Sequence, residues 1–285
     1  MKNNFILTGF SDEISSDISE QFAGLNALGI KYFEIRGVDG TNIADISEEK
    51  ARQVKKLADE NGIKVSSIGS PIGKINIKDP IEPHLEKLKH IIRLAKIFQT
   101  RYIRIFSFFI GEDEKAEDYK DEVMRRMKMM VKIAEEENVI LLHENEKGIY
   151  GDNAKRCHDI FENVVSDNLK AVFDPANFVQ CAQITYPDAW DMLKEHVVYM
   201  HIKDADGLMV VPPGKGKGNL KQILQSLKDE GYNGFLSLEP HLAQFDGLKD
   251  LEEDNNTSHV NAEKAGLRTF KTAYDALIEI INNLK

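Results

Sequence analysis

The sequence predicts an α/β protein built as a single closed (β/α)8 barrel over residues 1–285, and three observations carry this prediction. Eight short apolar runs of the kind that form strands recur along the chain. Segments with helical periodicity lie between them. The runs are continuous rather than alternating, which is typical of parallel strands buried on both faces. No interval is long enough for a second domain, and barrels of this type routinely reach this length as one unit.

The strands are expected in eight segments, in chain order 5–10, 32–37, 64–70, 102–109, 139–145, 169–175, 197–204 and 235–241. A doubly wound open sheet is the main alternative. That fold usually has fewer strands, and no Gly-x-Gly-x-x-Gly motif follows the first run here.

Capping residues indicate where several helices begin and end. Ser47 is a candidate N-cap for a helix that ends before Gly62. Asp79 followed by Pro80 predicts a cap and a first-turn proline. Other helices are expected from Asp152, over 219–231 and over about 261–283, and the methionine-rich stretch 123–134 is expected to be the packed face of a helix.

The overall composition argues against several classes of protein. The net charge is −10 and the pI about 5.4, which disfavours nucleic acid as a partner because such binding depends on Lys and Arg neutralising phosphates. No apolar stretch approaches the roughly 20 residues of a membrane span, and the start has too short an apolar run for a signal peptide. Cys157 and Cys181 form no framework or zinc spacing. We therefore expect a cytoplasmic protein without membrane contact. The sequence leaves open whether the chain forms a homo-oligomer.

Charged and imidazole side chains gather where the last four expected strands end. These residues are Glu144 and Glu146, then Asp174 and Asn177, then His201, Lys203 and Asp204, and finally Glu239 and His241. In a (β/α)8 barrel the active site lies at the carboxyl ends of the strands, so these groups are expected to converge. Each has a plain alternative: a strand-end Glu can be an ion-pair partner, His201 a core histidine, and Asp174 the start of a helix. The combination on successive strands favours a functional site.

A Glu, an Asp, a His and a second Glu at one point would form a cage for one divalent metal ion, which would offset the repulsion and burial of the carboxylates. Mixed oxygen and nitrogen ligands suit Mn, Mg, Co or Zn, and the carboxylate majority favours Mn or Mg, with Mn first. Alternation along the strand places Glu144 and Glu146 on the same face, so it does not choose between them.

Four motifs, "HENEKG", "FDPANF", "HIKDAD" and "LEPH", resemble the sugar isomerase/epimerase superfamily with the xylose isomerase-like TIM barrel, which also includes AP endonuclease family 2. "YFEIRG" and "YIRIFS" match its style, so the resemblance covers nearly the whole chain. It implies Glu144, Asp174, His201 and Glu239 as metal ligands. It further implies that Glu144 and Glu239 are the catalytic acid and base. Some members carry His three residues after the aspartate, where this chain has Asn177.

The expected function is a metal-dependent sugar isomerase or epimerase in carbohydrate metabolism. It would act on a sugar, sugar phosphate or polyol-derived keto-sugar by removing a proton next to a carbonyl through a metal-stabilised enediolate. A lyase or dehydratase on a keto-sugar, inosose or C-glycoside is the alternative. An apurinic endonuclease is disfavoured, because that branch needs three zinc ions and more histidines, and the first four strands end without one. A non-catalytic sugar-binding barrel is a further alternative.

Several residues are candidates for binding substrate. Lys203 would offset the residual negative charge of the metal cage, unless it only forms a buried ion pair. Asn177 and Glu146 are expected to contact substrate. Arg104 and Glu34 are expected to contact substrate or to support the residues that do, and either could equally form an ion pair inside the barrel.

Three loops have open roles. The segment 212–220, "PPGKGKGNL", could hold substrate hydroxyls or a phosphate, or be a solvated loop. The "SDEIS" segment after the first strand could form a pocket floor or cap the first helix. The acidic segment 243–256 could be a lid or a solvated loop.

Overall fold

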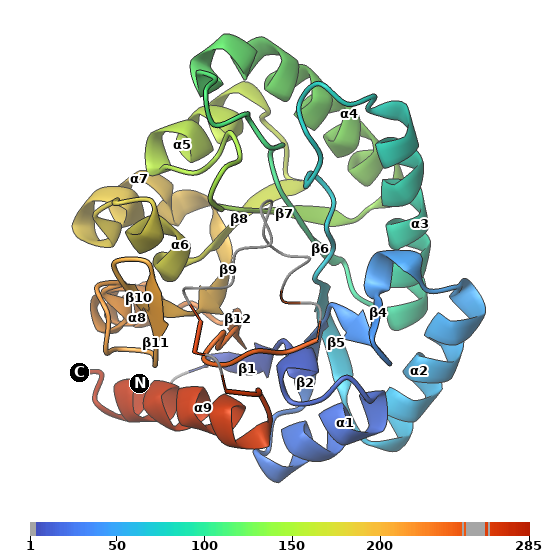
Figure 1. Cartoon of the computed structure of the whole chain (residues 1–285), viewed down its shortest axis with the longest axis vertical. Helices are drawn as coiled ribbons and strands as arrows, with labels where there is room; N and C mark the ends of the chain where they lie inside the picture. Colours follow the sequence, from blue (N-terminus) through green and yellow to red (C-terminus); the bar gives the residue numbers. More distant parts are fainter. Residues whose placement is uncertain (1–3, 247, 249–259, 262) are drawn as a thin grey trace.

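The computed structural model describes residues 4–246, 248, 260–261 and 263–285. Its centre is an eight-stranded parallel sheet with the order β1-β12-β9-β8-β7-β6-β5-β2 (Figure 1). The strands are β1 (Ile6–Gly9), β2 (Tyr32–Ile35), β5 (Lys64–Ile68), β6 (Tyr102–Ile105), β7 (Ile140–Glu144), β8 (Leu169–Phe173), β9 (Val197–Ile202) and β12 (Phe235–Leu238). All eight expected strands are present.

The sheet curves until its two ends meet. β1 and β2 stand next to each other in Figure 1, although no hydrogen-bonded ladder joins these two strands, both of which are fully described. The helices form a ring outside the strands. The (β/α)8 fold class is therefore confirmed, as a nearly closed barrel. The open-sheet alternative is wrong.

The described helices are α1 (Ile18–Ala27), α2 (Glu48–Glu60), α3 (Glu82–Phe98), α4 (Lys120–Glu137), α5 (Ala154–Asn163), α6 (Pro175–Gln180), α7 (Trp190–Leu193), α8 (Leu220–Asp229) and α9 (Leu267–Asn282). Two small hairpins, β3 (Gly37–Val38) with β4 (Thr41–Asn42) and β10 (Asp204–Asp206) with β11 (Met209–Val211), follow β2 and β9. Met124, Met127 and Met130 of α4 are buried, which confirms that its methionines form the packed face.

The strands end earlier than expected. The run 102–109 shows this most clearly: β6 stops at Ile105, and the Phe106 N–H then donates to the Ile72 carbonyl at 2.7 Å. These shortened ends leave the carboxyl side of the barrel lined by loops, where side chains are free of strand alternation.

Two of the predicted helix starts are confirmed, at Ser47 and at Asn219, which directly precedes α8. Ser47 accepts from the Lys50 N–H at 3.1 Å, as expected. The predicted starts at Asp79 and Asp152 are wrong. Asp79 accepts from the Asn76 N–H within a preceding turn, and the cap of α5 is Asn153. The final helix starts at 267 rather than 261, and the acidic segment 243–256 lies largely outside the described residues.

The two ends of the barrel interior differ in chemistry. Toward the amino ends of the strands, aromatic rings pack against one another: Tyr32 on Phe235, and Tyr102 on Tyr199. Above them, Ser66 links Thr8 at 2.7 Å to the Tyr199 hydroxyl at 2.9 Å. This aromatic and hydroxyl layer fills the interior toward the amino ends of the strands, and the charged groups lie beyond it, toward the carboxyl ends.

No helix in the described ranges is long and apolar enough to cross a membrane. Cys157 is buried and Cys181 half-buried, and both are free thiols.

Candidate metal centre

Four side chains meet at the carboxyl end of the barrel. Glu144, Asp174, His201 and Glu239 each offer one ligand atom, and these atoms lie within 4.8 Å of one another. None of the four residues is more than 2% exposed. They come from β7, β8, β9 and β12, which are consecutive in the sheet, so the parallel register delivers all four to one level.

The local structure explains how each group reaches that point. Glu144 is the last residue of β7, and Glu239 is the first residue after β12. Asp174 has two roles: its Oδ1 accepts from the Asn177 N–H at 2.9 Å and caps α6, while its Oδ2 lies 2.9 Å from Lys203 Nζ. The helix-start interpretation and the site interpretation of Asp174 therefore both apply, one oxygen to each.

His201 is the hub of the cluster. Its Nδ1 lies 3.0 Å from Glu144 Oε1, 3.5 Å from Glu239 Oε2 and 4.0 Å from Asp174 Oδ2. On the other side of the ring, Nε2 lies 3.2 Å from Glu34 Oε2, which also accepts from the Ser237 hydroxyl at 2.7 Å. A carboxylate behind a histidine fixes the ring orientation and leaves the opposite nitrogen for a metal.

Three buried cations surround the carboxylates. Arg104 Nη1 lies 3.2 Å from Glu144 Oε2, Arg36 Nη1 lies 3.1 Å from Glu239 Oε1, and Lys203 Nζ lies 3.1 Å from Glu239 Oε2. Phe10 lies against both guanidinium groups, with ring centroids 4.3 Å and 5.1 Å from the Arg36 and Arg104 Cζ atoms. These cations offset the cost of burying the acids.

The resulting pKa values separate the four groups. Burial alone would raise the pKa of both glutamates, but Lys203 and other cations hold the pKa of Glu239 well below its usual value, and His201 and Arg104 hold that of Glu144 below its own. For Asp174 burial prevails and raises the pKa to about 7, despite Lys203. Burial disfavours a charged imidazole, yet Glu144 and Glu34 raise the pKa of His201 well above its usual value.

The donor set fits a divalent metal. Glu144 Oε2 and Asp174 Oδ2 are buried and make no hydrogen bond, although cations stand near both. Each oxygen thus faces a cation but accepts no hydrogen bond, so a lone pair is left with which it could bind a metal ion. Three carboxylates and one imidazole, with a second carboxylate orienting the imidazole, are ligands that such a metal takes. The cluster could thus bind a metal ion.

The remaining predicted site residues fall into two groups. Lys203, Arg104 and Asn177 join the cluster, and Asn177 Nδ2 lies 3.3 Å from Glu144 Oε1. Glu146 does not: β7 has ended before it, so strand alternation no longer places it beside Glu144, and it pairs with Lys74 at 3.4 Å. The structure therefore separates two glutamates that sequence alternation left equivalent.

Sequence reasoning missed part of the site. Arg36 was not singled out, although it directly follows β2. It pairs with Asp12 at 2.8 Å and with Glu13 at 3.4 Å. The "SDEIS" segment therefore contributes two acids that contact Arg36 beside the cluster, and it does not cap α1, whose N-cap is Asp17. Burial raises the pKa of Glu13 to about 8. The neighbouring acids Asp12 and Glu239 add to this increase, and Arg36 opposes it. An acidic pair directly after the first strand was the available signal.

The Gly-Lys loop 212–220 binds an internal carboxylate. Asp204 accepts from the backbone N–H groups of Gly214, Gly216 and Gly218 at 2.8 to 3.0 Å. A bound phosphate would need these same backbone N–H groups. They instead bind Asp204, which holds the loop against the start of β10.

A family model described as "Xylose isomerase-like TIM barrel" matches residues 22–262. A 3-dehydroshikimate dehydratase from Bacillus anthracis is 22% identical over 238 residues, which cover 77% of this chain and 83% of that protein.

Solved structures show the same fold. A D-tagatose 3-epimerase-like protein superposes with a TM-score of 0.73 at 16% identity, covering 98% of this chain and 97% of the other. The IOLI protein, with a bound zinc atom, superposes with a TM-score of 0.75 at 15% identity, covering 99% of each chain. At these identities the likeness concerns the fold alone.

Metal affinity is expected to fall as the pH falls. The raised pKa of His201 means that its Nδ1 carries a proton at neutral pH, and a metal must displace that proton. Asp174, with a pKa of about 7, adds a second displaced proton between pH 6 and 8. Calorimetry in buffers of different ionisation enthalpy should detect one to two protons released per ion bound. The affinity should fall about tenfold per pH unit for each displaced proton. Binding that releases no protons at any pH would contradict this.

Glu34→Gln is expected to weaken metal binding about tenfold while the fold stays intact, because the ring of His201 loses its anionic partner. Titration with Mn2+ followed by electron paramagnetic resonance measures this directly. Glu49→Gln, on the exposed first turn of α2, is the control and should bind as wild type does. Equal affinity in both variants would remove Glu34 from the site.

Proposed function

The chain belongs to the xylose isomerase-like TIM barrel family, and on that premise we propose that it is a metal-dependent sugar isomerase or epimerase. It would act on a small polyhydroxylated carbonyl compound by moving a proton at the carbon next to the carbonyl. The observation that carries the proposal is the buried meeting of Glu144, Asp174, His201 and Glu239 at the carboxyl end of the barrel.

Glu144, Asp174, His201 Nδ1 and Glu239 would hold one divalent ion, with Mn2+ or Mg2+ favoured by the three carboxylates. When bound, the ion supplies Lewis-acid stabilisation of negative charge on substrate oxygens. Three carboxylates and one divalent ion would together carry a formal charge of −1. Lys203 balances this charge, because its Nζ lies 2.9 Å from Asp174 Oδ2 and 3.1 Å from Glu239 Oε2.

Glu144 and Glu239 are the proposed proton-transfer groups. β7 and β12 are separated in the sheet by β8 and β9, so the two carboxylates reach the substrate position from different directions. Their lowered pKa values keep both ionised at neutral pH, which suits the group that accepts the proton. The other glutamate would return a proton from the opposite face once it has taken one up.

The substrate is proposed to be a carbohydrate rather than a nucleic acid. Asn177, Lys203 and Arg104 present donors around the cluster, which suits hydroxyl and carbonyl oxygens. Glu146 and its partner Lys74 lie slightly further out, with side chains 11% and 8% exposed, where they could bind a distal hydroxyl.

A second candidate is a lyase or dehydratase, favoured by the sequence match to the 3-dehydroshikimate dehydratase. Both reactions begin with the same proton abstraction. They differ in the next step, because a dehydratase expels a hydroxyl group from the neighbouring carbon, whereas an epimerase or isomerase returns the proton.

Solvent exchange tests the roles of the two glutamates. A ketose that the enzyme turns over in deuterated water should take up deuterium at the carbon next to the carbonyl. Glu144→Gln and Glu239→Gln should each lower turnover at least about 100-fold, the typical loss of acid–base catalysis. Metal content is measured in each variant, so that loss of the ion is separated from loss of the base.

Glu146→Gln is the matched variant two residues along the chain. It should keep deuterium exchange and change mainly KM, because Glu146 stands apart from the cluster. Full turnover in Glu144→Gln together with an inactive Glu146→Gln would assign the base to Glu146. Isomerisation without any exchange would indicate a hydride shift instead.

Product mass separates the two candidate reactions. With a panel of ketoses and cyclic hydroxy-ketones we expect products of unchanged mass, because proton return leaves the formula intact. Loss of one water, with new ultraviolet absorbance from a conjugated product, would establish the dehydratase instead.

A further inference from the structure

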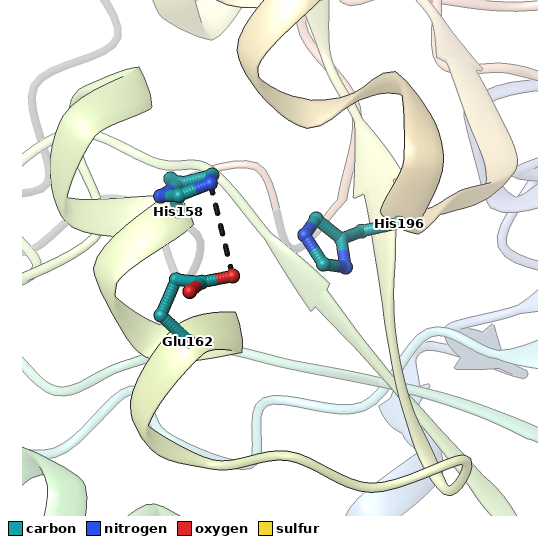
Figure 2. Close-up of side chains that lie close together, drawn as sticks. All are labelled: His158, Glu162 and His196. Atoms are coloured by element: carbon teal, nitrogen blue, oxygen red, sulfur yellow. Dashed lines mark ion pairs between the residues drawn. The ribbon is translucent and has the colours of Figure 1, made fainter.

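A second group of metal-ligating side chains lies at the opposite end of the barrel. Figure 2 shows His158 and Glu162 on α5 facing His196 across a gap. Each residue offers one ligand atom, and the three atoms lie within 4.8 Å of one another. His196 immediately precedes β9, at its amino end, whereas His201 stands near the carboxyl end of the same strand. His201 comes five positions after His196, which corresponds to about 17 Å of extended chain.

We propose that His158, Glu162 and His196 form a second metal site, selective for zinc, that ties α5 to the start of β9. Two imidazoles and one carboxylate are a common zinc set, with water as the fourth ligand. Zinc favours this nitrogen majority, whereas the carboxylate-rich cluster at the other end favours Mn or Mg.

The ligands are held in place by the fold. His158 and Glu162 are one helical turn apart, so their side chains lie on the same face of α5, and His158 Nε2 is 3.9 Å from Glu162 Oε1. The ring of His196 stacks on Phe161, with centroids 4.5 Å apart and an angle of 14° between the planes. Phe161 thereby fixes the plane of the third ligand.

The imidazole nitrogens are also available. Within the described residues neither His158 nor His196 makes a hydrogen bond, and the long contact to Glu162 is the ion pair of His158. Burial, and then His158, lower the pKa of His196, which favours the neutral ring that a metal requires.

Only a small movement is needed to bind the ion. Tetrahedral zinc with ligand distances near 2.1 Å holds its ligand atoms about 3.4 Å apart, so no separation needs to close by more than about 1.4 Å. The side chains of His158 and Glu162 are 39% and 63% exposed, so both have space to change rotamer as the ion binds.

Equilibrium dialysis against Zn2+ tests the site in the full-length protein. His158→Ala, His196→Ala and Glu162→Gln should each bind one zinc fewer per chain than wild type, whatever the other cluster binds. Glu195→Gln, an exposed carboxylate next to His196, is the matched control and should bind as much as wild type. Mn2+ binding should be unchanged in all four variants. Circular dichroism checks that each remains folded.

Thermal unfolding provides a second measurement, because a ligand that binds only the folded state stabilises it. Zinc should raise the Tm of His196→Ala less than that of wild type. Zinc stoichiometry equal to wild type in both histidine variants would overturn the site. Loss in the histidine variants but not in Glu162→Gln would overturn the proposed ligand set, and equal loss in Glu195→Gln would mark the binding as nonspecific.

Discussion

The structure depends on the burial of three carboxylates beside one imidazole, none of which is more than 2% exposed. Isolated carboxylates cannot be buried without compensation, so their neighbours must be cations. Arg36, Arg104 and Lys203 meet this need, and each is itself buried. Phe10 packs against the two guanidinium groups and shields them from solvent. The residues that balance the charge of the acids therefore come from β1, β2, β6 and β9 or from the residues directly after them.

That balance also governs what the centre does. Without a metal, the proton on His201 provides the positive charge between Glu144 and Glu34. A metal and that proton compete for one nitrogen, so the acidity of the pocket and its affinity for metal are linked properties. The aromatic layer toward the amino ends of the strands and the burial of the cluster suit chemistry that must exclude water from a reactive intermediate.

The two ends of the barrel carry different groups of side chains. The carboxyl end carries the buried cluster, and its loops are fastened internally, as the bonds from the glycines of 214–218 to Asp204 show. The amino end carries the half-exposed pair of histidines with Glu162, beside α5. β9 connects both ends, because its flanking and internal histidines contribute to each group.

The sequence by itself determined the barrel, its eight strands and the four groups that converge, because continuous apolar runs and their polar ends are local features of the chain. It could not choose between Glu144 and Glu146, since that choice depends on where the ladder of β7 stops. It also missed Arg36, and it allowed an ion pair for Glu34 without identifying His201 as the partner, since these contacts join strands far apart in the chain. Only the tertiary structure determines the contacts of Arg36 and Glu34, because closure of the barrel brings β2 beside β1 and across from β9.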